Sequence, residues 1–297
     1  MTRKSSAAHW RSSQRPRPRT DRPPATALPP MARARSTALL CVSLVAIVGV
    51  TAAGAEPVRM KYPEGPAHGF IVLSEAGKSI AHGELIQWLE RAVVASQLVI
   101  RFDDGSLYDE VVRFTQRPVF RVQSYRLVQR GPSFGEHADI EFDRSGQYRV
   151  RRRAKPGEEE QHAAGHVDLP EDVSNGMTST LLKNLMPHGS ATTHVVVFRP
   201  KPLVLELRLA PEGVDTFWVG TAAETATRFR LQPEVRGLTG VVATLVGKQP
   251  PPLDMWIARG HAPVLVRFEG PLYTDGPSWR IELSAPRWEP SAAPATP

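Results

Sequence analysis

Apolar and polar residues alternate in short runs along residues 69–152 and again after residue 193. Leu98, Ile100 and Phe102 occupy every second position, a spacing that predicts a strand with one buried face. Residues 103–106 follow directly and contain an Asp-Gly pair, which is frequent in the turn between two paired strands. The return strand is expected at 111–114, so this stretch predicts a β-hairpin.

Runs of the same kind, separated by turn residues, predict short strands along most of the chain. The expected strands cover residues 70–73, 80–89, 98–102, 111–114, 119–130, 138–142, 148–152, 194–198, 203–209, 214–219, 225–231, 240–246, 264–269 and 279–283. Within residues 119–130, Tyr125 is out of phase with Phe120 and Val122. This change of phase predicts a β-bulge near Gln123–Ser124.

The centre of the chain has a different pattern. Its apolar residues at helical spacing are Met177, Leu181, Leu182 and Leu185. They predict one helix over residues 172–185, which Pro187 and Gly189 end. Residues 154–166, just before it, carry Lys-Pro-Gly and three consecutive Glu, and we expect a solvated, charged loop there.

Many short strands and one helix define the expected fold class: mostly β, with a large curved antiparallel sheet. We expect this half-barrel or open barrel to have the helix against its concave face. A single β-rich domain would cover residues 69–285, after a lead-in at 56–68 and before a loose tail at 286–297. The alternative is two smaller β domains divided near residue 190.

The first 55 residues indicate export. Residues 1–30 are rich in Arg, Pro and Ser, which predicts a disordered extension. Residues 31–55 resemble a signal peptide: a basic start, an apolar stretch and small residues before a cut between Ala55 and Glu56. We therefore expect a periplasmic or secreted protein, in contact with the membrane only if the segment stays uncleaved. Met31, rather than Met1, is our hypothesis for the true start.

The distribution of charge argues against nucleic acid as a partner. The chain has 37 basic and 30 acidic residues, but nine of the basic residues and only one of the acidic residues precede Glu56. The leading segment thus carries +8 and the remainder −1, so the body lacks the positive field that binds phosphates. Cys41 is the one cysteine and lies in the apolar stretch. Cleavage at Ala55 would leave no thiol for a disulfide or a metal.

Several segments carry a resemblance to a known group. They are residues 102–110 (FDDGSLYDE), 130–134 (RGPSF), 168–177 (DLPEDVSNGM) and 246–251 (VGKQPP), with Trp256-Ile257. These segments resemble an uncharacterised family of exported bacterial β-proteins, a domain of unknown function. That family is similar to the half-barrel lipoprotein carriers of the periplasm, although this chain is longer. The resemblance implies an apolar concave pocket that binds a lipid or other apolar ligand, and it transfers no active-site residue.

Two motifs suggest chemistry but lack the required context. Gly131–Gly135 fits the G-x-S-x-G pattern around Ser133, yet a nucleophile elbow needs a following helix, and residues 138–142 predict a strand. His162 and His166 are four residues apart beside several carboxylates, but glycines flank them. We expect a strand-ending corner at the first and a solvated acidic loop at the second.

Other clusters also have simpler explanations. Asp109 and Glu110, with the acidic turn residues Asp103 and Asp104, could suggest acid–base catalysis, but turn formation already accounts for the Asp-Asp-Gly sequence. Residues 237–248 resemble a phosphate-binding loop in composition alone, because the required spacing fails. Trp88, Trp218, Trp256, Trp279 and Trp288 are expected mainly in the core. We therefore assign no catalytic residue, metal or cofactor, and leave the ligand-binding residues unassigned.

One basic cluster remains, Arg149–Arg153, beside Glu158–Glu160. Three functions stay open. The first is a non-enzymatic protein that binds a lipid or other apolar ligand in its concave sheet. The second is a structural or adaptor domain that binds another envelope protein through a sheet edge or the Arg149–Arg153 face. The third, more remote, is a serine hydrolase that uses Ser133.

Overall fold

The structure is a computed structural model. It describes residues 57–154, 157–234, 253–260, 262–284 and 286–288. The predicted signal peptide with its cut at Ala55 and Glu56, the expected strand at 240–246 and the loop at 237–248 lie outside these residues. All described residues belong to one compact unit.

One antiparallel sheet contains every strand of the described residues. The strands are β1 (Ala67–Glu75), β2 (Lys78–Glu90), β3 (Val93–Phe102), β4 (Leu107–Thr115), β5 (Arg121–Arg130), β6 (His137–Asp143), β7 (Gln147–Arg153), β8 (Gln161–His166), β9 (Ala191–Arg199), β10 (Lys201–Val219), β11 (Ala222–Glu234), β12 (Leu253–Ala258), β13 (Val264–Gly270), β14 (Trp279–Leu283) and β15 (Pro286–Trp288). The order across the sheet is β15-β10-β11-β12-β13-β14-β1-β2-β3-β4-β5-β6-β7-β8, and β9 also pairs with β10. Strands before and after residue 190 thus form the same sheet.

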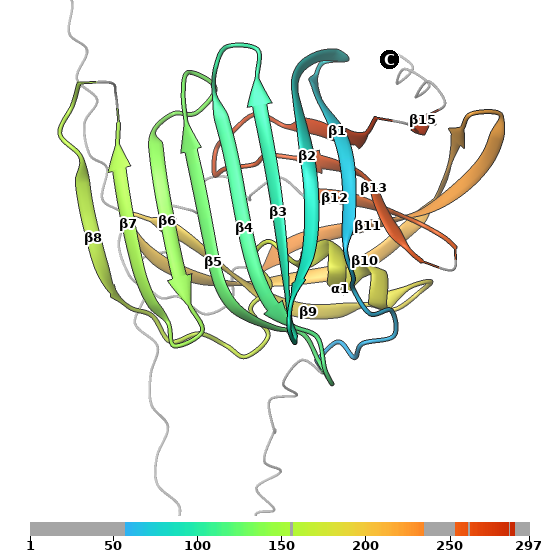
Figure 1. Ribbon diagram of the computed structural model, residues 1–297, viewed down its shortest axis with the longest axis horizontal. Coiled ribbons are helices and arrows are strands. Elements are labelled where there is room, and N and C mark those ends of the chain that lie inside the picture. Colours follow the sequence, from blue (N-terminus) through green and yellow to red (C-terminus); the bar gives the residue numbers. More distant parts are fainter. Residues whose placement is uncertain (1–56, 155–156, 235–252, 261, 285, 289–297) are drawn as a thin grey trace, which may run out of the picture. The chain divides into compact units, whose positions relative to one another are not determined.

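The sheet curls around one helix, α1 (Thr178–Leu185), which Figure 1 shows between the β3–β8 wall and the β9–β12 wall. Leu181 and Leu182 of the helix are buried in the same apolar cluster as Phe114 of β4 and Phe229 of β11. The helix therefore fills part of the concave side. The predicted fold class, a curved antiparallel sheet with a helix inside it, is confirmed.

Two details of the strand prediction are also confirmed. Residues 103–106 form the turn between β3 and β4, where Gly105 has a φ of +84° and donates to the Phe102 carbonyl at 3.0 Å. In the β4–β5 pair, Arg113 lies opposite Ser124 while Phe114 lies opposite Val122. Gln123 is the extra residue of this bulge, and it returns the apolar side chains of both halves of β5 to the inner face.

The helix is shorter than predicted. It begins at Thr178 rather than at residue 172, because the residues before it bond to β9. The Ser174 amide donates to the His194 carbonyl at 2.8 Å, and the Asn175 side chain bonds both ways with Val196. Gly176 then adopts a φ of +68°, which turns the chain into the helix.

Other elements differ from the prediction as well. The ranges 203–209 and 214–219 are one strand, β10, which a bulge between Pro211 and Gly213 carries past the predicted break. The expected loop at 154–166 contains β8, and the expected tail at 286–297 begins with β15. Strand β12 was not predicted, because its six residues lie between three consecutive prolines, at 250–252, and Gly260.

The lead-in is fixed to the C-terminal part of α1. The amides of Lys61 and Tyr62 donate to Asn184 Oδ1 at 2.7 and 2.8 Å. Lys183 Nζ lies 2.5 Å from Glu64 Oε1, and the two side chains are only 15% and 9% exposed. A nearly buried ion pair and a buried amide therefore hold the first described residues against the helix.

Candidate functional site

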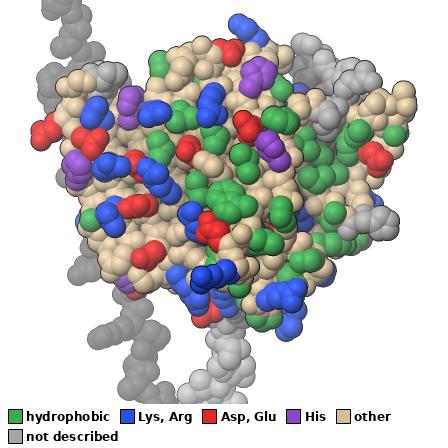
Figure 2. Space-filling model, in the orientation of Figure 1, with side chains coloured by type: hydrophobic (Ala, Val, Ile, Leu, Met, Phe, Trp, Pro, Cys, Tyr) green, Lys and Arg blue, Asp and Glu red, His purple; other side chains and the backbone are tan. Residues whose placement is uncertain are grey.

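The outer face of β5–β8 carries the basic cluster that the sequence singles out. Strand pairing places Arg126, Glu141, Arg149 and Ala164 in one row across four strands. The next row is Val128, Asp139, Arg151 and His162. Figure 2 shows basic and acidic side chains interspersed over this part of the surface. Each arginine thus has a carboxylate as a close neighbour.

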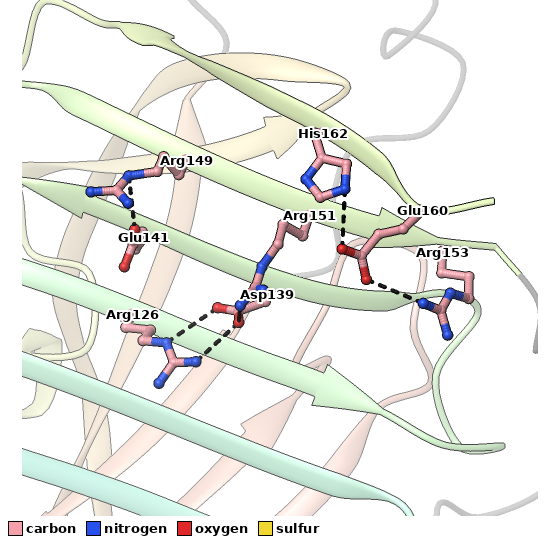
Figure 3. Close-up of polar contacts among 8 residues, drawn as sticks. All are labelled: Arg126, Asp139, Glu141, Arg149, Arg151, Arg153, Glu160 and His162. Atoms are coloured by element: carbon pink, nitrogen blue, oxygen red, sulfur yellow. Dashed lines mark hydrogen bonds and ion pairs between the residues drawn. The ribbon is translucent and has the colours of Figure 1, made fainter.

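Asp139 joins two of these arginines (Figure 3). Arg126 Nη2 donates to Asp139 Oδ2 at 2.9 Å and its Nε to Oδ1 at 3.2 Å, while Arg151 bonds to the same carboxylate. Burial acts to raise the pKa of Asp139, but the hydrogen bonds from both arginines outweigh it and hold the pKa below its ordinary value. Asp139 therefore stays ionised and keeps both arginines in place.

The other arginines of the cluster have separate partners. Arg149 Nε lies 3.1 Å from Glu141, and its side chain is 79% exposed. Arg153 lies 3.4 Å from Glu160, which also contacts His162 at 3.2 Å. Arg152 leaves this face: it pairs with Glu136 at 2.8 Å and donates to the Phe198 carbonyl of β9. Of the predicted Arg149–Arg153 cluster, the arginines at 149, 151 and 153 thus lie on the outer face, whereas Arg152 links β7 to β9.

Strand β8 is an open edge of the sheet, because within the described residues it pairs with β7 alone. The Val167 amide donates to the Gly146 carbonyl on the β7 side. Antiparallel strands alternate the direction of their backbone groups. The N–H and C=O groups of residues 161, 163 and 165 therefore face β7, and those of His162, Ala164 and His166 face outward.

The composition of β8 leaves this edge unprotected. Natural edge strands are usually protected by Lys and other charged residues, or by Pro, which lacks a backbone N–H. The sequence of β8 is QHAAGH, in which Gln161, His162, Ala163, Ala164 and His166 are exposed. Tyr148 of β7 lies across Gly165, where an added Cβ would come within 2.9 Å of the tyrosine hydroxyl oxygen. At Ala163 and Ala164, small side chains thus leave the backbone of the edge accessible.

Two hollows adjoin this edge on the outer face. Their volumes are about 600 and 650 Å³, and Arg126, Glu141, Arg149 and Ala164 line both. The larger hollow also contains Asp139, Arg151 and His162. A segment that docked along β8 would therefore have its outward side chains beside the mouth of a polar depression.

A second notable group lies on the inner face. Leu98, Glu110 and Leu127 form one row across β3–β5 and remain partly exposed, while Val112 of the next row is 1% exposed. The Tyr125 hydroxyl donates to Glu110 Oε1 at 2.8 Å. Burial raises the pKa of Glu110, although hydrogen bonds from Tyr125 and Tyr108 act to lower it. Glu110, considered above with Asp109 as a possible acid–base residue, thus lies on the inner face, away from the turn residues Asp103 and Asp104.

The remaining predicted motifs are structural. Ser133 lies in the turn between β5 and β6, and its hydroxyl donates to Asp104 at 2.7 Å. A strand follows this serine, so the turn lacks the helix of a nucleophile elbow. His162 and His166 both face outward on β8, where each contacts a separate acid. In the part of the chain that the structure describes, no group of three or more His, Cys, Asp or Glu could hold a metal.

The tryptophans divide between core and surface. Trp256 and Trp279 are 4% and 3% exposed, as expected for core residues, whereas Trp218 near the β10–β11 turn is 36% exposed. None of the described helices is long and apolar enough to span a membrane. Strand β8 was not predicted, because residues 161–166 (QHAAGH) contain neither a regular alternation nor a β-branched or aromatic residue.

No family model matches the sequence, and no curated protein matches it. Among solved structures, the chain is similar to one described as a beta-barrel-like protein of domain of unknown function DUF1849 from Brucella abortus. The TM-score is 0.36 and the identity 10%, over 77% of this chain and 100% of that chain. The fold described above is based on the strand pairing within this chain and not on that similarity.

Proposed function

We propose that this chain is an exported protein of the cell envelope that docks an extended segment of another envelope protein along the edge of β8. The observation that carries the proposal is the open, unprotected edge. Three residues, His162, Ala164 and His166, direct backbone donors and acceptors outward. Each backbone hydrogen bond to an added strand would contribute about 0.5–1.5 kcal/mol. This mode of binding, strand addition, needs no catalytic residue.

The surroundings of the edge support the same function. The Arg152 tie to β9 and the core contacts of Val150, which is 3% exposed, hold β7 firmly behind β8. An edge backed by rigid structure loses less entropy when a partner binds. The polar hollows beside Ala164 would accept the outward side chains of the partner. The export of the chain is part of the proposal and rests on residues 31–55.

The test is site-specific cross-linking in the producing cells. A photoreactive residue at position 162 should yield one discrete product with an envelope protein. Ala164→Pro removes an outward N–H without altering the bonds to β7 and should abolish that product. A photoreactive residue at Phe70, which is 59% exposed on β1, is the matched control. A product that persists in the Ala164→Pro background, or that forms equally from position 70, would refute docking at this edge.

A second candidate function is binding of a lipid or other apolar ligand on the concave side. It is favoured by the partly exposed inner row of Leu98 and Leu127, and by Leu253 and Met255 of β12. Leu127, Leu253 and Met255 each contact both large core clusters, so they lie where the two clusters meet. Native mass spectrometry of the protein purified from the envelope tests this candidate. A retained mass of lipid size supports it, and a bare chain that starts at Glu56 counts against it.

A further inference from the structure

We infer that the segment docked on β8 is acidic at alternate positions, with small apolar residues between them. This inference names the partner's chemistry and rests on the docking function proposed above. The geometry of the β7–β8 pair carries it. Arg149 lies opposite Ala164 and Arg151 opposite His162, and all four side chains are on the outer face.

Distance along the sheet makes contact with these arginines feasible. Neighbouring strands are about 4.8 Å apart, so an added strand would lie about 10 Å from β7. An extended arginine side chain and a glutamate side chain together span that separation. Ala164 carries only a methyl group between them and leaves the path open. The residue opposite Ala164 on the added strand is therefore placed to meet Arg149.

The charges on this face favour a carboxylate there. The larger hollow contains Arg126, Arg149 and Arg151 against only Asp139 and Glu141. Asp139 is already shared by two arginines, which leaves Arg149 with a single acid. The Arg149 and Glu141 side chains are 79% and 43% exposed, and a pair as exposed as this one contributes only about 0–1 kcal/mol. Arg149 can therefore exchange Glu141 for an incoming carboxylate at little cost.

On the inner face of the edge, small apolar residues of the added strand would be favoured. Here the added strand would lie beside Ala163 and Gly165, with Val150 buried behind them. The Tyr148 ring covers Gly165 and also packs against Phe198 of β9, with ring centroids 5.6 Å apart. A valine-sized side chain would extend this apolar surface, whereas a charged side chain would lose hydration against it. Glutamate and valine in alternation match both faces.

The test measures binding of three labelled eight-residue peptides to the full-length chain by fluorescence anisotropy. The peptides are capped at both ends and alternate Val with Glu, with Gln or with Lys. The protein variants are Ala164→Pro with Ala164→Ser as its control, and Arg149→Gln with Arg280→Gln as its control. Arg280 of β14 pairs with Glu269 at 2.7 Å and lines neither hollow.

We expect the Glu/Val peptide to bind about threefold or more tightly than the Gln/Val peptide, and the Lys/Val peptide to bind most weakly. Arg149→Gln should remove most of that preference, while Arg280→Gln preserves it. Ala164→Pro should weaken binding of every peptide about tenfold or more, and Ala164→Ser should not.

The outcomes separate the two proposals. If all three peptides bind equally, or the Lys/Val peptide binds best, while Ala164→Pro still weakens binding, the acidic preference is wrong and the docking edge stands. If no peptide binds, or Ala164→Pro binds as the unchanged chain does, docking at β8 itself is overturned.

Discussion

Breaking the Glu64–Lys183 pair should cost much of the stability of the fold. Lys183→Met leaves the Glu64 carboxylate nearly buried, with one remaining side-chain hydrogen bond, from Gln87 at 2.9 Å. Loss of one partner of a buried pair typically destabilises by about 3–5 kcal/mol. The lead-in can move toward water, so we expect the lower value, about 3 kcal/mol. Glu64→Gln alone should cost a similar amount, because it leaves the lysine uncompensated.

The double variant provides the decisive comparison. With both charges removed, the loss should fall to about 1–2 kcal/mol, which gives a coupling energy of several kcal/mol. The exposed pair Arg149–Glu141 is the matched control and should couple by about 0.2–1 kcal/mol. Urea unfolding measures each free energy of unfolding, provided that the slope m is unchanged. Single variants of Glu64 and Lys183 that lose less than about 1 kcal/mol would refute the argument that this pair is shielded from water.

Three further predictions concern the interior and the lead-in. Burial raises the pKa of Glu110. Its protonated form therefore stabilises the fold at a pH below the ordinary carboxyl pKa. This stabilisation is lost as the pH rises through the raised pKa of the folded protein. Glu110→Gln should therefore raise the melting temperature relative to the unchanged chain at about pH 8 and not at about pH 4; a gain that is equal at both would contradict this. The Leu182 side chain is 0% exposed, so Leu182→Ala should lower the free energy of unfolding in urea by about 2–5 kcal/mol. A loss as small as that caused by Leu89→Ala, at an exposed leucine, would mean that the helix is not part of the core. Asn184→Ala removes the acceptor of two backbone amides and should cost about 2 kcal/mol; hydrogen exchange at Lys61 and Tyr62 should accelerate, and unchanged exchange would contradict the role of Asn184.

Much of the fold could be predicted from the sequence because alternation is a local signal. The hairpin at 103–106 and the bulge at Gln123 depend on neighbouring residues only, and both were predicted. The start of α1 could not be predicted, because Ser174 and Asn175 are held by β9, which comes later in the chain. Periodicity favours a helix from residue 172 and contains no information about that competing partner.

The candidate site was predictable only in part. The charges at 149–153 are visible in the sequence, but their division between two faces depends on the register with β6 and β8. Strand β8 lacks the β-branched and aromatic residues that usually indicate a strand. It forms because residues 147–152 of β7 provide backbone groups for it to pair with. The small residues Ala163, Ala164 and Gly165 therefore explain both why the sequence does not predict this strand and why its backbone is accessible.

Hydrogen exchange at single amides of β8 tests the central claim most directly, because that claim concerns which backbone groups face outward. In the full-length chain alone, we predict slow exchange at residues 161, 163 and 165 and fast exchange at His162, Ala164 and His166. Addition of the Glu/Val peptide should slow the second set and leave the first unchanged. Equal protection of both sets in the free chain, or no gain at residues 162, 164 and 166 with the peptide, would contradict docking along this edge.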